Sequence, residues 1–273
     1  MDNSPFPETM ERHETLKSGL LPLVFEGVSY EIGGTKLIKD ISASFEAGSV
    51  TVVLGPNGAG KSLFLRLGHG LIRPSGGRVF WRGPDGVVNP GRGQAMVFQR
   101  PTMLRRSVAA NLHHALKQRR IARPRRHEIV EDMLQRTGLT RLAKSPARSL
   151  SVGEQQRLAV ARAWSVEPQV LFMDEPAAAL DPAETPALED IRAANQAAGT
   201  KIIMSTQDLS QARRLADEVV FLNRGRMLEQ APAERFFEHP ENDLAEAFLN
   251  GELLWWNRKE LKPPEHLKGR WQK

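Results

Sequence analysis

The chain has 273 residues, of which 40% are hydrophobic and 26% charged, a globular composition that excludes a disordered or fibrous protein. It contains no cysteine, which excludes a disulfide scaffold, a thiolate metal site and thiol catalysis, and no apolar run approaches the roughly 18 residues of a membrane-spanning helix. Residues 1–20 lack the apolar centre of a secretory signal. We therefore expect a cytosolic protein in which any membrane role comes through a partner.

The first predicted elements are a polar, Pro-containing and mobile arm over residues 1–20 and an antiparallel sheet after it. Leu23–Ile32 alternates apolar and polar residues, as in a half-exposed strand, and Lys36–Ala47 is expected to form the return strands. Tyr30 and Ile32 share one face of the first strand because side chains repeat with period two. Either could pack against a nucleotide base, or both could be ordinary sheet residues.

A phosphate-binding loop is predicted next. The buried strand Val50–Leu54 is followed by eight residues that fit G-x-x-x-x-G-K-[ST], namely Gly55, Pro56, Asn57, Gly58, Ala59, Gly60, Lys61 and Ser62. Glycines let successive N–H groups point at one anion, and a helix starting near Gly60 adds its positive dipole end. Lys61 is expected to reach the β- and γ-phosphates and Ser62 to hold Mg²⁺. A glycine-rich turn without a ligand is the alternative.

The middle of the chain changes character. Gln94–Phe98 is predicted to be a short buried strand before Gln99, which is either a metal ligand or a turn residue. Residues 107–148 are predicted to form helices interrupted by prolines, as an insertion in an α/β framework. Residues 100–148 hold 13 Lys and Arg against 3 Asp and Glu, a net charge of +10 within a chain of net charge +6. Such a basic segment indicates nucleic acid, an anionic membrane or an acidic partner, or only a solvated helical face.

Two later stretches carry candidate chemistry. Ser151 and Glu154 have the spacing of a capping box at the start of a helix. Val170–Met173 reads as a buried strand with Asp174 and Glu175 at its carboxyl end, the edge at which parallel sheets bind ligands. Asp174 is expected to hold Mg²⁺ through water, and Glu175 to polarise the attacking water. Paired surface charges are the alternative.

The remaining elements complete the framework. Lys201–Thr206 is predicted to be a strand leading to Gln207, and residues 219–230 a hairpin, with helices at about 232–238 and 242–250. Residues 255–273 form a basic tail that contains Trp255, Trp256 and Trp271. We expect this tail to be partly disordered, with membrane or partner contact as a second interpretation.

In this order and spacing, the motifs resemble those of the nucleotide-binding subunit of an ATP-binding-cassette (ABC) transporter, over roughly Leu23–Leu254. GPNGAGKS resembles the Walker A motif, Gln99 the Q-loop, LSVGEQQR the signature, VLFMDE the Walker B motif and Ala179–Asp181 the D-loop. The resemblance implies an α/β P-loop NTPase with a RecA-like core, an N-terminal antiparallel β subdomain and a helical subdomain over about 100–165, all within an ABC domain spanning 21–254.

The resemblance also implies a mechanism. In a head-to-tail homodimer, Mg²⁺-ATP on one phosphate loop is closed over by the partner's signature residues. The implied roles are catalysis by Glu175, Lys61 and Gln207, metal binding by Ser62, Gln99 and Asp174, a D-loop contact by Asp181, and trans contacts to ATP by Ser151, Val152, Gly153 and Glu154.

Several positions depart from the family pattern. Val152 replaces a glycine, Ala179 a serine and Gln207 the switch histidine, and Ile32 rather than Tyr30 has the spacing of the adenine-stacking aromatic. A glutamine can hydrogen-bond a γ-phosphate but cannot become cationic. We therefore expect slow but measurable ATP hydrolysis.

Stretches such as VFQRPTMLRRSVAANL are most similar to ATPases of bacterial tungstate importers, relatives of the molybdate and phosphate systems. This implies integral membrane permease partners at the cytoplasmic face of the cell membrane and, indirectly, an extracytoplasmic oxyanion-binding protein. The alternatives are an importer ATPase for phosphate, molybdate or an amino acid, a degenerate binding-only subunit, and a soluble ABC-type ATPase acting on nucleic acid or ribosomes. Because the chain has one cassette and no heptads, we expect no nucleic-acid partner.

Overall fold

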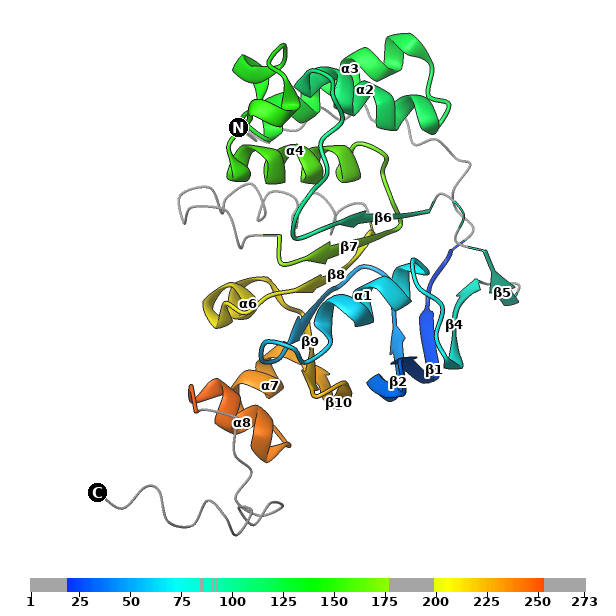
Figure 1. The fold of residues 1–273 in the computed structure, drawn as a ribbon, viewed down its shortest axis with the longest axis vertical. Coiled ribbons are helices and arrows are strands. Elements are labelled where there is room, and N and C mark those ends of the chain that lie inside the picture. Colours follow the sequence, from blue (N-terminus) through cyan, green and yellow to red (C-terminus); the bar gives the residue numbers. More distant parts are fainter. Residues whose placement is uncertain (1–18, 84–85, 90, 92, 177–198, 253–273) are drawn as a thin grey trace, which may run out of the picture.

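The computed structural model describes residues 19–83, 86–89, 91, 93–176 and 199–252 (Figure 1). Three sequence predictions lie outside these residues: the N-terminal arm apart from its last two residues, the D-loop with Asp181, and the Trp-containing tail. Within the described ranges, no helix is both long and apolar enough to cross a membrane.

The central feature is a six-stranded sheet that is parallel except at one edge. Its strands are arranged in the order β10 (Arg226–Pro232), β9 (Glu218–Asn223), β3 (Val50–Leu54), β8 (Lys201–Ser205), β7 (Val170–Asp174) and β6 (Gln94–Val97). Only β10 pairs antiparallel. Every residue of β3, β7 and β8 is buried, as expected when helices cover both faces of a parallel sheet.

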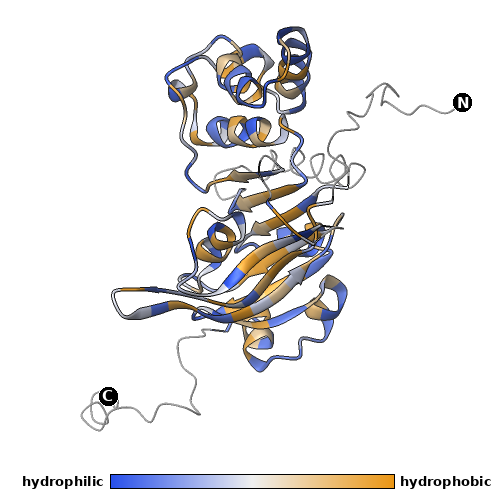
Figure 2. Ribbon diagram, turned by 90° about the vertical axis from the view of Figure 1, so that its right-hand side faces the viewer, coloured by the Kyte–Doolittle hydropathy of each residue, from blue (hydrophilic) through white to orange (hydrophobic). Residues whose placement is uncertain are grey.

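Alternate residues of these strands enter two separate cores. On one face, Val53, Phe172 and Ile203 pack with α1 (Lys61–His69) and the antiparallel sheet. On the other face, Val52 and Leu171 pack with the remaining helices, and Figure 2 shows the hydrophobic residues concentrated in the strands between these layers. The covering helices include α6 (Leu209–Leu215), α7 (Ala233–Glu238) and α8 (Asp243–Leu249).

The second sheet is antiparallel and lies beside α1. Its strands follow the order β2 (Thr35–Phe45), β1 (Leu23–Ile32), β4 (Gly76–Gly83) and β5 (Gly86–Val88). Phe25 stacks on Phe64 of α1 with ring centroids 4.6 Å apart, and Phe45 meets Phe64 edge-on at 5.9 Å. These rings anchor the sheet to the helix that follows the phosphate loop. The return segment is one strand, rather than the two or more expected over Lys36–Ala47.

The third layer is helical and extends from the β6 edge of the parallel sheet (Figure 1). It contains α2 (Val108–Gln118), α3 (Arg123–Arg136) and α4 (Val152–Trp164), with short 3₁₀ helices at Thr140–Leu142 and Ala147–Ser149. From the sequence, Pro124 was predicted to interrupt a helix, but the structure places it at the start of one. It lies in the first turn of α3, where its missing N–H costs no intrahelical hydrogen bond.

Candidate nucleotide-binding site

The phosphate loop requires glycine at two positions. Gly55 has φ 146°, and a Cβ there would lie 2.0 Å from the carbonyl oxygen of Leu222. Gly60 has φ 104°, and its Cβ would lie 2.9 Å from the Cδ1 atom of Ile38. The loop is therefore packed between β2 and β9. A side chain at Gly55 would collide with backbone, and one at Gly60 would strain the positive φ and push against the Ile38 side chain.

The start of α1 is left open for an anion. Gly60 is its N-cap residue, with no side-chain cap and no acidic residue in the first turn. The first N–H groups of a helix lack intrahelical partners and carry the positive end of the dipole. In this loop they fit a phosphate group, as the motif predicts.

Lys61 is the buried cation of the loop. Its side chain is 6% exposed, and Nζ donates hydrogen bonds to the carbonyl oxygens of Gly55 at 2.8 Å and Pro56 at 3.1 Å. Burial lowers the pKa of Lys61, while the charges of Glu175 and Asp174 oppose that shift. A buried ammonium held only by carbonyl groups is poorly compensated, so a phosphate would complete its coordination.

The predicted metal ligands Ser62 and Asp174 lie together. Ser62 Oγ donates to Asp174 Oδ1 at 2.9 Å, and Ser205 Oγ donates to the same oxygen at 2.8 Å. The described residues contain no group of three or more His, Cys, Asp or Glu side chains suited to a metal. This set fits Mg²⁺ bound with a nucleotide, because Mg²⁺ at phosphates takes few protein oxygens and keeps several waters.

The carboxylate of Glu175 is held on both sides. Its Oε2 accepts from Gln99 Nε2 at 2.9 Å and its Oε1 accepts from Gln207 Nε2 at 2.6 Å. The backbone of Glu175 has φ 46°, an uncommon value outside glycine, and its N–H donates to Ser205 Oγ at 3.0 Å. Side chains that follow β6, β7 and β8 thus meet at one edge of the sheet.

Ser205 was missed by the sequence prediction. It accepts from the Glu175 N–H and donates to Asp174, so it fixes both acids relative to each other. Its position at the end of a buried strand was a signal for a site residue. This strand, β8, pairs with β7, and Asp174 and Ser205 lie opposite each other in the register. Gln99 lies two residues beyond β6 and donates to Glu175; its predicted role as a metal ligand remains a prediction.

The comparisons with known proteins agree with this geometry. The family described as ABC transporter matches residues 38–178. This chain belongs to that family. Relatives include the phosphate import ATP-binding protein PstB 2 of Natronomonas pharaonis, 34% identical over 85% of this chain and 88% of its own length, and the tungstate uptake system ATP-binding protein TupC of Peptoclostridium acidaminophilum, 36% identical over 75% and 94%.

A methionine import ATP-binding protein, MetN of Caulobacter vibrioides, is 35% identical over 83% of this chain and 72% of its own length. Among solved structures, cbiO1 of Clostridium perfringens, part of the ABC transporter complex cbiONQ, superposes with a TM-score of 0.68 at 28% identity, covering 80% of this chain and 91% of that one. The expected α/β P-loop fold of an ABC-type ATPase is therefore confirmed.

In this ABC ATPase the two candidate base-contacting residues differ in exposure. Ile32 is 57% exposed at the end of β1, whereas Tyr30 is half-buried and packs against the core beneath the sheet. Tyr30 thus packs as a sheet residue, and its contact with a base stays a prediction. Ile32 is available to a base through apolar contact.

The signature residues of the ABC ATPase lie at the start of α4. Ser151 and Glu154 form the predicted capping box: Ser151 Oγ accepts from the Glu154 N–H at 3.2 Å, and Glu154 Oε2 accepts from the Ser151 N–H at 2.8 Å. Val152 is 66% exposed, and Gly153 follows it in the first turn. Across the described ranges, the hydrogen bonds of Ser151 stay within the start of α4.

Proposed function

We propose that this ABC ATPase binds Mg²⁺-ATP at the loop ending at Ser62 and couples hydrolysis to the import of an oxyanion, tungstate or a related anion, through permease subunits at the cytoplasmic face of the cell membrane. One observation carries the ATPase part of the proposal. The phosphate cradle, the Ser62–Asp174 pair and the doubly held carboxylate of Glu175 converge on one edge of the parallel sheet.

The proposed binding step uses the loop and α1. The N–H groups at the start of α1 and the ammonium of Lys61 bind the phosphates, and Lys61 Nζ exchanges its hydrogen bonds to Gly55 and Pro56 for phosphate oxygens. Ser62 and Asp174 would hold Mg²⁺, which neutralises the charge that develops on the phosphate oxygens. Ile32 contacts the base by apolar packing.

The proposed hydrolytic step uses Glu175. Its carboxylate accepts a hydrogen bond from the attacking water and orients it toward the γ-phosphorus. The amides of Gln99 and Gln207, which now donate to Glu175, are positioned to hold that carboxylate and to donate to a phosphate oxygen once ATP is bound. Positioning and electrostatic stabilisation supply most of the catalysis in phosphoryl transfer.

The proposed active unit is a head-to-tail homodimer. The supporting observations are the exposed Val152 and an α4 N-terminus at which the Ser151 side chain and the Glu154 carboxylate hydrogen-bond to each other's backbone. A second copy would place Ser151, Val152, Gly153 and Glu154 over the γ-phosphate, with the D-loop Asp181 at the seam. Loss of phosphate would then open the dimer and pass movement to the permease.

Glu175→Gln tests the ATPase assignment. We expect hydrolysis, measured as phosphate release, to fall by about 10²- to 10⁴-fold, because the variant loses its general base, while binding of a fluorescent ATP analogue is retained. Glu238→Gln is the control, since Glu238 is an exposed glutamate on α7. Equal hydrolysis by Glu175→Gln and the unaltered chain would refute the role of Glu175.

The cargo is tested with the permease. The relatives include phosphate, tungstate and methionine import proteins, and phosphate and tungstate are tetrahedral oxyanions. The tagged chain is purified with its permease from native membranes and reconstituted with the extracytoplasmic binding protein. We expect tungstate, and more weakly molybdate or phosphate, to stimulate hydrolysis. Stimulation by methionine alone would refute the oxyanion proposal, and steeply salt-dependent binding to RNA or DNA would favour the nucleic-acid alternative.

A further inference from the structure

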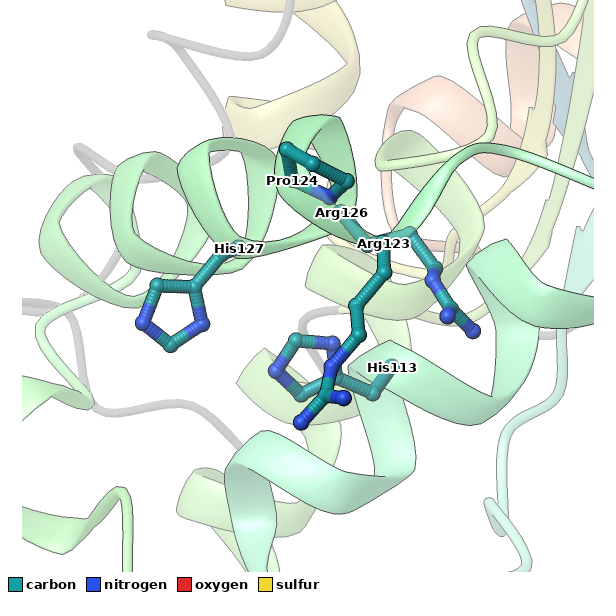
Figure 3. A pocket seen from close by; sticks show the side chains of 5 residues that line it. All are labelled: His113, Arg123, Pro124, Arg126 and His127. Carbon is teal, nitrogen blue, oxygen red and sulfur yellow. The ribbon is translucent and has the colours of Figure 1, made fainter.

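A polar cavity that is open to solvent lies in the helical layer, between α2 and the first turn of α3. It has a volume of about 640 Å³ and is lined by His113, Arg123, Pro124, Arg126 and His127 (Figure 3). None of these residues belongs to the phosphate loop or to the sheet edge described above. The cavity is therefore separate from the nucleotide site.

The lining of this cavity contains two guanidinium groups and two imidazoles, without a carboxylate. Two nearby acids of α3 pair with arginines outside the lining: Glu128 with Arg125 at 2.8 Å and Asp132 with Arg136 at 2.8 Å. A third, Glu131, lies 3.7 Å from the Nε2 atom of the lining residue His127.

The guanidinium groups of Arg123 and Arg126 consequently have no acidic partner in the described part of the chain. The Nε atom of Arg126 is also buried and has no hydrogen-bond partner there. A buried donor without an acceptor is costly, and Arg matches the oxygens of an oxyanion with its planar fork of N–H groups.

The backbone adds to this positive potential. The helix α3 has 14 residues, no side-chain N-cap, no acid in its first turn and basic residues there instead. The Arg126 N–H donates to the carbonyl oxygen of Ala122 at 3.0 Å and makes the first intrahelical hydrogen bond. The N–H groups of Arg123 and Arg125 come before it in the helix and have no intrahelical acceptor. Cations at a helix N-terminus oppose the dipole, and an anion there relieves that repulsion.

The two imidazoles respond to the same charges. The rings of His113 on α2 and His127 on α3 are stacked, with centroids 5.8 Å apart and planes 19° from parallel. Burial lowers the pKa of His113, and the positive charges of His127, Arg126 and Arg123 lower it further. A bound anion would offset all three charges, which gives the site a reporter group.

We propose that this cavity binds a tetrahedral oxyanion carrying two negative charges, the chemical class of phosphate, either free or as a phospholipid headgroup. The guanidinium groups of Arg123 and Arg126 supply charged N–H donors to the anion, the imidazole of His113 contacts it from α2, and the N-terminus of α3 adds its dipole. The proposal uses no residue of the ATPase site, so it stands or falls independently of the proposed function.

The test follows histidine ring signals by NMR in the full chain, saturated with Mg²⁺-ADP so that the phosphate loop is filled. The chain has seven histidines, and His113→Gln and His127→Gln assign the two signals of the cavity. Inorganic phosphate is titrated at constant ionic strength. We expect saturable shifts confined to these two signals and a higher pKa of His113 when phosphate is bound.

Matched variants separate a site from a generally basic surface. Arg126→Gln is expected to weaken phosphate binding by about tenfold or more, because it removes a hydrogen bond between charged groups. Arg125→Gln, one residue away and paired with Glu128, is expected to leave it unchanged. Arg126→Lys keeps the charge and should bind with intermediate affinity, and unchanged Mg²⁺-ADP binding confirms that each variant is folded.

Vesicles identify the source of the anion. If phosphatidylcholine vesicles containing phosphatidate bind the chain, and if Arg126→Gln or added phosphate abolishes that binding, the ligand is a lipid headgroup. Saturable phosphate binding without vesicle binding identifies a free anion. Equal affinity of Arg126→Gln and Arg125→Gln for both probes, or shifts spread without saturation over all histidines, would overturn the proposal.

Discussion

The Glu175 carboxylate accepts hydrogen bonds from two amides, and one of them, Gln207, stands where the family pattern has a titrating histidine. The side chain of Gln207 donates to one carboxylate oxygen and Gln99 to the other, at 2.6 and 2.9 Å. An amide keeps its hydrogen-bonding capacity at every physiological pH, whereas the switch histidine that Gln207 replaces changes charge near pH 6.5. The hydrogen bond from Gln207 that orients the Glu175 carboxylate therefore does not depend on the protonation of its donor.

The substitution Gln207→His tests that difference. A protonated imidazole beside Glu175 would stabilise its carboxylate form and make it a weaker base. We expect the ratio of turnover by Gln207→His to turnover by the unaltered chain to fall as the pH is lowered from about 8 to about 6, through the ordinary histidine range. Gln207→Ala, which adds no titrating group, is the control. A constant ratio across this range would contradict the explanation.

His69, at the end of α1, links pH to stability. Its Nδ1 atom is buried without a hydrogen-bond partner among the described residues, and its ring meets Phe172 edge-on at a centroid distance of 5.6 Å. Burial lowers the pKa of His69, so the unfolded chain binds this proton more tightly than the folded chain. The contribution of His69 to stability is thus complete above about pH 6.5 and is lost as the pH falls below that value.

Urea unfolding measures this linkage. The free energy of unfolding of the unaltered chain should fall between about pH 7 and pH 5.5 with a contribution from His69 of at most about 1.4 kcal/mol per pH unit. His69→Gln should reduce that slope, while His239→Gln, which removes an exposed histidine, should leave it as it is. Identical slopes for the His69 variant and the unaltered chain would show that His69 does not carry the effect.

Two helices begin with the same cap but face different surroundings. Ser107 caps α2 by accepting from the Ala110 N–H at 3.2 Å, and Ser151 caps α4 by accepting from the Glu154 N–H at the same distance. The local energetics are matched, because each serine satisfies one free N–H group of its helix. Only Ser151 lies in the segment that we propose closes over the nucleotide of a second copy.

Ser151→Ala and Ser107→Ala should therefore agree in stability and differ in activity. Loss of either cap is expected to cost about 1 kcal/mol, measured as the free energy of unfolding. Hydrolysis at saturating ATP should fall by about tenfold in Ser151→Ala alone, since it loses a hydrogen bond to a charged phosphate oxygen. If both variants lose hydrolysis equally, the effect is one of stability and Ser151 has no role across the dimer.

The parts of the candidate site that could be predicted from the sequence are those whose motifs lie within a short stretch of residues. The phosphate loop, the capping box of Ser151 and the two acids at the end of β7 were predicted from the sequence. In each case the signal, a glycine pattern, a cap spacing or the end of a buried strand, lies within a few adjacent residues. The bonds from Gln99 and Gln207 to Glu175 were not predicted. They join side chains 76 and 32 residues apart, and their directions depend on the loops after three strands.

The basic segment shows the same limit. The sequence shows the net positive charge of this segment. It does not show the cavity between α2 and α3, which depends on how these helices pack, or the ion pairs of Glu128 with Arg125 and of Asp132 with Arg136. The net charge of a segment does not tell which of its Arg and Lys side chains lack an acidic partner. That distinction separates a solvated helical face from a candidate anion site.

For the molecule as a whole, the phosphate loop and the start of α4 belong to different layers. The phosphate loop is packed against β2 and the turn after β9, where the Gly225 N–H donates to the Ala59 carbonyl at 2.9 Å. The helical layer extends from the opposite edge of the sheet and carries the signature helix α4 (Figure 1). A second copy in head-to-tail orientation is the proposed way for this helix to reach a phosphate loop.

This arrangement predicts a nucleotide-dependent change in mass. With Glu175→Gln, which should bind ATP without hydrolysing it, we expect Mg²⁺-ATP to convert the 30.4 kDa monomer to a species of twice that mass in sedimentation velocity, and Mg²⁺-ADP to leave it monomeric. The negative γ-phosphate is needed to join the loop of one copy to the helix N-terminus of the other. Lys61→Ala combined with Glu175→Gln should stay monomeric with ATP, because the loop loses its buried cation. A Glu175→Gln chain that is saturated with ATP, as measured by fluorescence in the same sample, and yet remains monomeric would refute closure by a second copy.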